Sequence, residues 1–388
     1  MGKTKILIYD SITDGHHPDY LFHLINYINS HDQFEAFVAS GEAFFNEYLQ
    51  HPTRKNIHWG NHVHFLPIST DKINQLHKHP IYKRSFIEYK YFTQLGEKHE
   101  VDHGLIMYVD YFQLGLICGP KPDFSVSGIL FRPTFHMNVN GLQKKILKLF
   151  KSTLLKIILK RSFVSRLYAL DSSVISFWKN ESKLKYLNEP VSSLSIDQSK
   201  VSAFKALQQI DHEQRIFLNF GYLDERKGID QFLKACRLLP EKEASKICLI
   251  LAGNISSSYQ KHIEKQLAET PHIKVITFFK YLDQTEYQIL FEACDVVLML
   301  YQKHVGMSSV LVRAAAVHKP VLLENFGVLS KIAQTYQLGK LVHSTNSEKL
   351  KNELLEVLQN GIVCDAEKQI QFAKNNTPEA FASKLLSI

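Results

Sequence analysis

The stretch IFLNFGYLDERKG, residues 216–228, decides the fold of this chain. The largely apolar segment Ile216–Phe220 predicts a buried strand, and the loop Gly221–Gly228 leads from it into a predicted helix, Ile229–Leu239. The same alternation continues along the chain, with strands expected at 247–251, 274–279 and 296–300 and a helix at 284–293. Strands alternating with helices at this spacing predict an α/β fold with a parallel sheet, and ligands of such sheets bind at the carboxyl ends of the strands.

The length of the chain, 388 residues, predicts two domains, because single hydrophobic cores stop growing at roughly 250–300 residues. We expect an N-terminal domain over 1–195 and a C-terminal domain over 205–366, with the polar segment 188–214 as the linker. In the N-terminal domain a helix is expected from Pro18 to Asn29, and strands are expected at 5–9, 36–39, 64–67, 105–109, 124–127 and 164–169. The tail 367–388 is predicted to form one or two amphipathic helices.

The composition is typical of a soluble globular protein, with 45% hydrophobic and 22% charged residues. The five cysteines are scattered without a CxxC pair, which favours buried, reduced thiols and a reducing compartment. No run of the sequence approaches the roughly 18 apolar residues that a membrane span needs. The first apolar run is too short for a signal peptide. The sequence therefore predicts a cytoplasmic protein.

Four short motifs follow one another in a fixed order in the second half of the chain. Gly221-x-Leu223 with Lys227-Gly228 comes first, and Ala252-Gly253, 294–297 and 314–321 follow. In this order the motifs resemble the C-terminal domain of GT-B glycosyltransferases, in particular the retaining enzymes of glycosyltransferase family 4. The resemblance implies two Rossmann-like domains that face a cleft, with the tail 367–388 crossing back to the N-terminal domain. It also implies a nucleotide-diphosphate sugar as the substrate, no further cofactor and no metal.

Three positions depart from the family pattern. The diphosphate-binding arginine of the family falls at Tyr222, and the two glutamates of its E-x7-E motif fall at Val305 and Arg313. In the family the first glutamate contacts the donor sugar and the second contacts the nucleotide ribose. The motif is therefore degenerate in this chain, and Lys227 is what remains of the charged set.

Candidate donor-binding residues lie in the loops after two predicted strands. Lys227, beside Gly228, could neutralise a leaving diphosphate, or it could be a solvated loop lysine. The backbone N–H groups at the start of the alanine-rich helix could bind phosphate, or its serines could simply cap the helix. The residues at this helix start are Gly306, Met307, Ser308 and Ser309.

Two further residues of the same region have open interpretations. Arg313 lies about one turn into the alanine-rich helix, where it could bind phosphate as a planar fork or be an ordinary surface arginine. His304 lies beside the missing glutamate, where it could contact sugar hydroxyls or have no role.

In the N-terminal half, Gly15, His16 and His17 follow the first predicted strand. A glycine there permits the close approach of a ligand, and a histidine could hydrogen-bond sugar or phosphate. Asp110 follows the strand expected at 105–109 and is either a cleft residue or a turn aspartate. We expect His17 and Asp110 to be the catalytic candidates and Gly15 to contact the donor. The two histidines lack the ligand spacing of a metal site.

The segment 141–170 contains eight lysines and arginines and no acidic residue. A helical projection groups five lysines on one side and apolar residues mainly on the other. Such a helix could lie on an anionic membrane, or it could pack on its own domain with a solvated basic face. Binding of nucleic acid is not expected, because stacking aromatics are not interleaved with the basic residues. The predicted membrane-contact residues are Lys144, Lys145, Lys148, Lys151 and Lys156.

The functional hypothesis is a glycosyltransferase that moves a sugar from a nucleotide diphosphate to a lipid-linked or polysaccharide acceptor. We expect a cytoplasmic enzyme peripheral to the inner face of the membrane. The alternative is an inactive GT-B pseudo-enzyme that binds a partner glycosyltransferase or its substrate. A sugar-nucleotide epimerase is a third interpretation, but it needs catalytic carboxylates that the sequence does not place.

Overall fold

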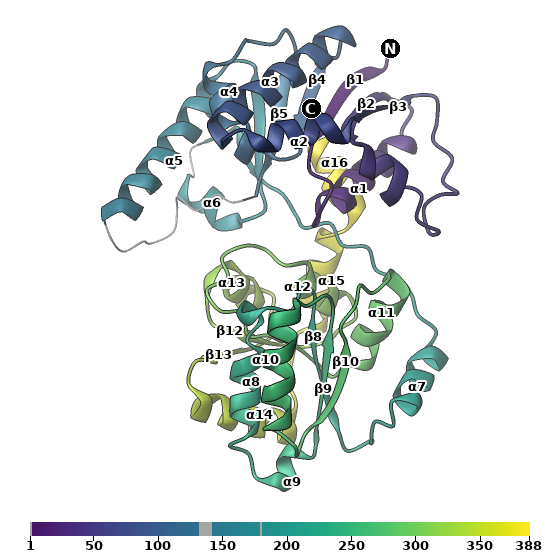
Figure 1. Ribbon diagram of the computed structural model, residues 1–388, viewed down its shortest axis with the longest axis vertical. Coiled ribbons are helices and arrows are strands. Elements are labelled where there is room, and N and C mark those ends of the chain that lie inside the picture. Colours follow the sequence, from purple (N-terminus) through teal and green to yellow (C-terminus); the bar gives the residue numbers. More distant parts are fainter. Residues whose placement is uncertain (1, 132–141, 179–180) are drawn as a thin grey trace. The chain divides into compact units, whose positions relative to one another are not determined.

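The computed structural model divides into two α/β units, each built around one parallel sheet (Figure 1). It describes residues 2–131, 142–178 and 181–388, and the side chain of Lys144 lies outside this description. The first unit comprises Met1–Pro190 and Pro378–Ile388, and the second comprises Val191–Thr377. The chain therefore leaves the first unit, builds the whole second unit and returns to the first.

The first unit holds a seven-stranded sheet in the order β3-β2-β1-β4-β5-β6-β7. Its strands are β1 (Thr4–Asp10), β2 (Phe34–Gly41), β3 (Val63–Ile68), β4 (His103–Ile106), β5 (Ser125–Leu130), β6 (Val164–Ala169) and β7 (Leu184–Tyr186). Its helices are α1 (His17–Asn29), α2 (Thr70–Lys78), α3 (Ile81–Lys98), α4 (Gln113–Cys118), α5 (Leu142–Lys160), α6 (Ser172–Phe177) and α16 (Pro378–Leu385). The strand expected at 105–109 ends earlier, at Ile106, because a 3₁₀ turn forms at Val109–Tyr111.

Helix α16 packs against α1 within the first unit. The ring of Phe381 lies 5.1 Å from that of Tyr20, and Tyr168 of β6 donates a hydrogen bond to the carbonyl oxygen of Lys384 at 2.9 Å. Phe381 is fully buried. The last segment of the chain is therefore part of the core of the first unit.

The second unit holds a six-stranded sheet in the order β10-β9-β8-β11-β12-β13. Its strands are β8 (Arg215–Phe220), β9 (Ile247–Ala252), β10 (Lys274–Phe278), β11 (Val296–Met299), β12 (Val321–Glu324) and β13 (Gly339–Val342). Its helices are α7 (Gln198–Leu207), α8 (Ile229–Cys236), α9 (Glu241–Ala244), α10 (Ser257–Ala268), α11 (Gln284–Ala293), α12 (Ser309–Ala316), α13 (Gly327–Thr335), α14 (Ser347–Asn360) and α15 (Ala366–Asn375).

Alternate residues of each strand in the second unit enter two cores, one on each face of the sheet. In β8, Ile216 and Leu218 pack with α11, α12 and α13, whereas Phe217 packs with α8, α10 and α14. Burial on both faces is why these strands are almost continuously apolar. The parallel sheet predicted from residues 216–300 is confirmed.

The tail differs from the expected single returning segment 367–388. Helix α15 lies in the second unit, where Phe372 is buried with its ring 5.0 Å from that of Tyr336. The chain re-enters the first unit at Pro378, which begins α16. The amphipathic pattern predicted the helices but not the break at Thr377 between two different cores.

Candidate functional site

The loops at the carboxyl ends of β8 and β11 meet in the second unit. Gln302 donates its backbone N–H to the carbonyl oxygen of Arg226 at 2.8 Å, which ties the two loops together. Gly228 adopts a left-handed backbone (φ 73°), and a Cβ there would lie 2.2 Å from the carbonyl oxygen of Leu300. Glycine is therefore required at position 228, because the loops approach more closely than any side chain permits.

Lys227 is buried between these loops. Its Nζ donates hydrogen bonds to the carbonyl oxygen of Phe220 at 2.8 Å and to the hydroxyl of Tyr301 at 3.0 Å. The same Nζ lies 4.4 Å from the ring centroid of Tyr301. An ammonium has three N–H donors, and these contacts use two of them. Lys227 is therefore a fixed positive charge at the strand ends, and a solvated loop lysine is ruled out by its 6% exposure.

His304 is held by Arg226 across the two loops. The guanidinium Nη1 of Arg226 donates to Nδ1 of His304 at 3.0 Å, and the His304 ring lies 5.3 Å from the ring of Tyr301. Burial and the neighbouring Arg226 lower the pKa of His304 to about 4. His304 is therefore neutral near pH 7, with its proton on Nε2, because a guanidinium can only donate.

The segment from Gly306 to Ser309 leads into α12. Ser308 is the N-cap residue, but its side chain makes no capping hydrogen bond. Met307 packs against the core of the second unit. A Cβ on Gly306 would meet nothing closer than the His304 ring at 3.8 Å, so the space beside this backbone is open. The expected anion site therefore has an accessible backbone at the start of an eight-residue helix.

Arg313 lies on the side of α12 that faces α11. Its Nη1 donates to the hydroxyl of Tyr287 at 2.7 Å and to the carbonyl oxygen of Ser192 at 3.4 Å. The guanidinium also stacks 4.4 Å from the Tyr287 ring. Arg313 is thus a half-buried residue with protein partners rather than a solvated surface arginine.

In the first unit His17 forms a buried pair with Asp10. His17 Nδ1 lies 2.8 Å from Asp10 Oδ2, and the backbone N–H of Ile12 donates to Asp10 Oδ1 at 3.0 Å. The side chains of His17 and Asp10 are 7% and 1% exposed. A carboxylate only accepts hydrogen bonds, so Nδ1 of His17 carries a proton. Asp10 therefore sets the tautomer of His17.

Asp110 and His17 are linked through Phe131. Asp110 Oδ2 accepts a hydrogen bond from the backbone N–H of Phe131 at 2.9 Å. The Phe131 ring lies 5.4 Å from the His17 ring, and Tyr108 lies 5.0 Å from His17 on another side. Gly15 precedes this cluster with φ 64° and no atom within 4 Å of a Cβ position. The two catalytic candidates of the sequence thus share one aromatic cluster.

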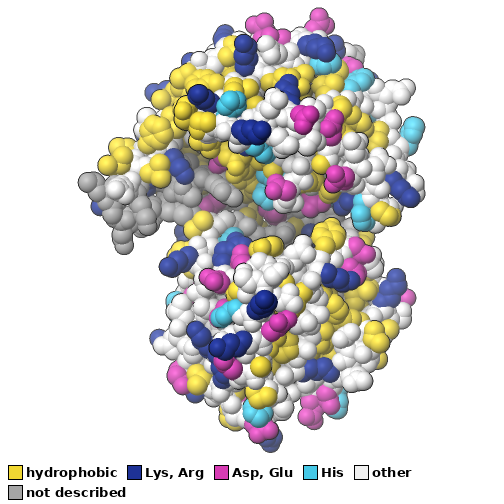
Figure 2. Space-filling model, viewed as in Figure 1, with side chains coloured by type: hydrophobic (Ala, Val, Ile, Leu, Met, Phe, Trp, Pro, Cys, Tyr) yellow, Lys and Arg dark blue, Asp and Glu magenta, His cyan; other side chains and the backbone are white. Residues whose placement is uncertain are grey.

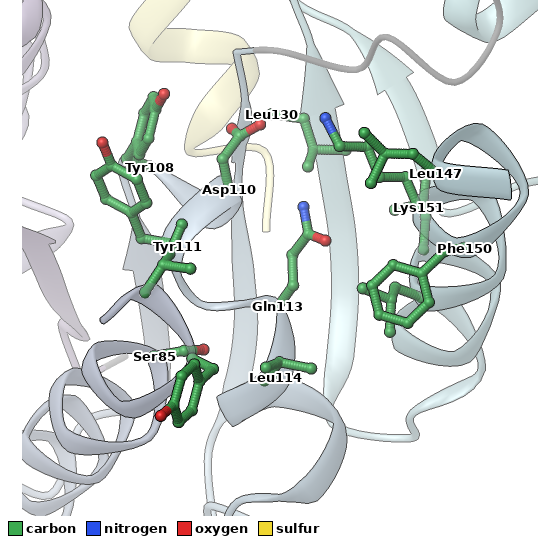
Figure 3. Close-up of a pocket in the computed structure, with 14 residues that line it drawn as sticks. Ser85, Tyr108, Asp110, Tyr111, Gln113, Leu114, Leu130, Leu147, Phe150 and Lys151 are labelled. Carbon is green, nitrogen blue, oxygen red and sulfur yellow. The ribbon is translucent and has the colours of Figure 1, made fainter. Parts of the chain in front are cut away.

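The predicted membrane-contact lysines do not form a single row. Lys145 is exposed, whereas Lys151 lines a groove between α3, α4 and α5 (Figure 3). Lys148 and Lys156 lie 5.9 Å and 5.7 Å from the rings of Phe177 and Trp178 at α6. The lysine positions follow the packing of α5 on its own unit.

The apolar residues of α5 differ from the expected single face. Leu155, Ile158 and Leu159 enter the core of the first unit. Ile146 and Leu147 are more than half exposed. Leu155 and Leu159 lie outside the apolar side of the helical projection, yet they fasten the helix to its own unit. The amino-terminal half of α5 extends its apolar side chains into solvent.

Sequence reasoning missed Asp10, Tyr301, Tyr287 and Arg226 as parts of these clusters. Asp10 and Tyr301 each stand at the end of an apolar strand, β1 and β11. That position was the available signal, because side chains there meet at one edge of a parallel sheet. Tyr287 and Arg226 gave no such signal. No group of three His, Cys, Asp or Glu side chains within the described ranges could hold a metal ion.

Comparison with known proteins finds one family model that matches part of the chain. Residues 202–378 match the sequence model of the family described as Glycosyl transferases group 1. No curated protein sequence matches the chain.

Solved structures resemble the chain over almost its whole length. A glycosyltransferase from Rickettsia africae has a TM-score of 0.71 at 14% identity, covering 99% of this chain and 97% of the other. The Anabaena protein HepE in complex with UDP has a TM-score of 0.68 at 15% identity, covering 99% and 98%. A sucrose-phosphate synthase from Thermosynechococcus elongatus has a TM-score of 0.69 at 14% identity, covering 99% and 97%. The predicted GT-B fold is confirmed.

Proposed function

We propose that the protein transfers a sugar from a nucleotide diphosphate to a lipid-linked or polysaccharide acceptor, because residues 202–378 match the model of the family described as Glycosyl transferases group 1. The observation that carries the proposal is the pair of tied loops at the ends of β8 and β11. They hold a fixed ammonium, Lys227, and the loop after β11 continues into the accessible backbone before α12. Fixed donors and charges of this kind stabilise the negative charge that develops on a leaving diphosphate.

The donor would bind with its diphosphate at Lys227 and at the N–H groups of Gly306–Ser309. Helix amino termini favour anions without any side-chain charge. His304, neutral and fixed by Arg226, would donate one hydrogen bond from Nε2 to a sugar hydroxyl. Arg313 would contact the nucleotide through the edge of its guanidinium that Tyr287 does not use. HepE was solved with UDP and with UDP-glucose, so uridine nucleotides are the first ligands to test.

The acceptor would bind in the first unit at His17 and Asp110. With Nδ1 of His17 bound to Asp10, Nε2 is the ring nitrogen that would hydrogen-bond a sugar hydroxyl. We propose transfer with retention, in which the leaving phosphate takes the proton of the attacking hydroxyl. In that reaction His17 positions the hydroxyl and no protein nucleophile is needed.

The basic residues of α5 would hold the protein at an anionic membrane surface. Each lysine near such a surface contributes on the order of 1 kcal/mol. No helix within residues 2–131, 142–178 and 181–388 is long and apolar enough to cross a membrane.

Binding of UDP to the full chain tests the donor site, with Gly306→Val as the informative variant. A Cβ at residue 306 meets open space, so this variant should fold normally yet place a branched side chain where the diphosphate binds. UDP at 100 times its Kd should stabilise the wild-type protein by about 2.7 kcal/mol, and Gly306→Val should lose most of this effect. Gly2→Val, which also meets no atom within 4 Å, is the matched control. Equal stabilisation of Gly306→Val and the wild type by UDP would contradict the proposed donor site.

A partner-binding pseudo-enzyme is the second candidate, and one observation favours it. Arg313 occupies the position of a family glutamate and already has Tyr287 and Ser192 as partners. Nucleotide binding separates the two candidates, because a pseudo-enzyme that has lost its donor site should show no stabilisation by UDP, UDP-glucose or other nucleotide sugars.

A further inference from the structure

The first unit carries a groove between α3, α4 and α5 that no part of the donor site uses. Its volume is about 350 Å³, which lies in the range of small-molecule sites. Ile81 and Tyr82 line it from α3, Leu114 from α4, and Leu147 and Phe150 from α5. Figure 3 shows Leu147 and Phe150 opposite Gln113 and Leu114, with open space between them. The walls are therefore mainly apolar.

The outer end of the groove continues into exposed apolar side chains. Ile81 and Tyr82 are 58% and 52% exposed, and Leu147 and Phe150 are 54% and 55% exposed. Leu149, outside the groove, is 69% exposed. Figure 2 shows hydrophobic side chains gathered over this part of the first unit. Contiguous exposed apolar surface of this kind marks an interaction site.

The inner end of the groove is polar and adjoins the buried pair of His17 and Asp10. Asp110, Gln113 and Tyr108 line it there. Tyr108 also packs on His17, with ring centroids 5.0 Å apart, and Asp110 binds the backbone of Phe131 beside the same histidine. A ligand lying along the groove would thus present its inner end to the proposed acceptor site.

The α5 side of the groove carries positive charge. Lys151 lines it from α5, and Lys145 and Lys148 stand on the same helix one to two turns earlier. Helix α5 contains no acidic residue. An amphiphile with a hydrocarbon chain and a phosphate group matches this combination, because the chain would bury apolar area and the phosphate would meet the lysines.

We propose that this groove binds the hydrocarbon chain of a lipid acceptor whose sugar is linked to the lipid through phosphate. The chain lies between Leu114 and Phe150, the phosphate contacts Lys151, and the sugar reaches His17. This inference rests on the proposed function and chooses the lipid-linked acceptor over the polysaccharide. In this proposal the groove is a substrate site, and the exposed side chains around it contact the membrane surface.

Calorimetric titration of the full chain with farnesyl phosphate, below its micelle concentration, tests the proposal. Leu114→Trp should fill the groove from within and weaken binding at least tenfold. Leu147→Glu alters a half-exposed side chain and should have the same effect by placing a carboxylate beside the phosphate and chain. Leu149→Ser is the matched control on α5, because residue 149 does not line the groove. Inorganic phosphate should bind at least a hundredfold more weakly than farnesyl phosphate.

Three results would overturn the inference. Unchanged binding by both Leu114→Trp and Leu147→Glu would place the chain elsewhere. Inorganic phosphate binding as tightly as farnesyl phosphate would show that the lysines bind a phosphate alone. Binding lost in Leu149→Ser but kept in Leu114→Trp would show adsorption on the exposed surface of α5. Stabilisation of the same samples by UDP reports the donor site separately. Loss of the lipid-binding proposal with UDP binding intact would leave the proposed transferase function unaffected. Absence of UDP binding would reject the transferase function itself.

Discussion

Replacement of Lys227 by methionine should loosen the second unit while leaving the first intact. Methionine keeps the length and most of the apolar stem of lysine but removes the ammonium. The change leaves two buried acceptors, the carbonyl oxygen of Phe220 and the hydroxyl oxygen of Tyr301, without their donor. Each unsatisfied buried group costs about 1–3 kcal/mol. The desolvation of the buried ammonium is relieved at the same time, so we expect a net destabilisation of about 2–3 kcal/mol.

Hydrogen exchange of the β8 peptide, followed by mass spectrometry, measures this loss in the full chain. A destabilisation of 2–3 kcal/mol corresponds to roughly 30- to 150-fold faster exchange, at about 1.4 kcal/mol per factor of ten. Both tryptophans of the protein, Trp59 and Trp178, lie in the first unit. Their fluorescence during urea unfolding therefore reports that unit alone and should match the wild type. Exchange in β8 within threefold of wild type would refute the view of Lys227 as a clamp between two loops.

Other substitutions test the remaining features. Gly228→Ala should destabilise the second unit by about 2–4 kcal/mol, because it combines a left-handed backbone with a Cβ 2.2 Å from the oxygen of Leu300. Gly15→Ala has a similar left-handed backbone but open space around its Cβ, so it should destabilise the first unit by only about 1–2 kcal/mol. Thermal unfolding measures both losses. Burial lowers the pKa of His103 to about 4 in the folded protein. As the pH falls from about 6.5 to 4, His103 therefore takes up a proton in the unfolded chain but not in the folded one, so the stability of the first unit should fall. His103→Gln should remove this contribution to the loss of stability in tryptophan-monitored unfolding. Phe381→Ala should destabilise the first unit by about 3–5 kcal/mol in the same experiment, and exchange in β8 should stay unchanged.

The strands and loops of the second unit were predictable because their pattern is local. The strand expected at 247–251 is β9, and the helix expected at 284–293 is α11. A buried parallel strand must be apolar on both faces, so its sequence alone identifies it. The loops that carry the proposed donor site follow directly from the strand ends.

The partners of the site residues were not predictable, because they come from distant parts of the chain. Lys227 and Tyr301 are 74 positions apart, and Arg313 and Tyr287 are 26 positions apart. Periodicity places each of these residues on a helix or loop but does not say which side chain it meets. The predicted faces of helix α5 were wrong for a related reason, because one helical projection cannot represent two halves that lie in different surroundings.

The placement of α16 sets the order in which the protein can be completed during synthesis. The first unit lacks Phe381 and the rest of Pro378–Ile388 until the whole second unit, Val191–Thr377, has left the ribosome. At about 5–20 residues per second this delay is on the order of 10–40 s. During that interval the α1 surface around Tyr20 has no Phe381 to cover it, whereas the second unit, continuous in sequence, needs no later segment. A ribosome-associated chaperone would therefore find its binding surface on the unit made first, and this surface would be covered only once Pro378–Ile388 has been made.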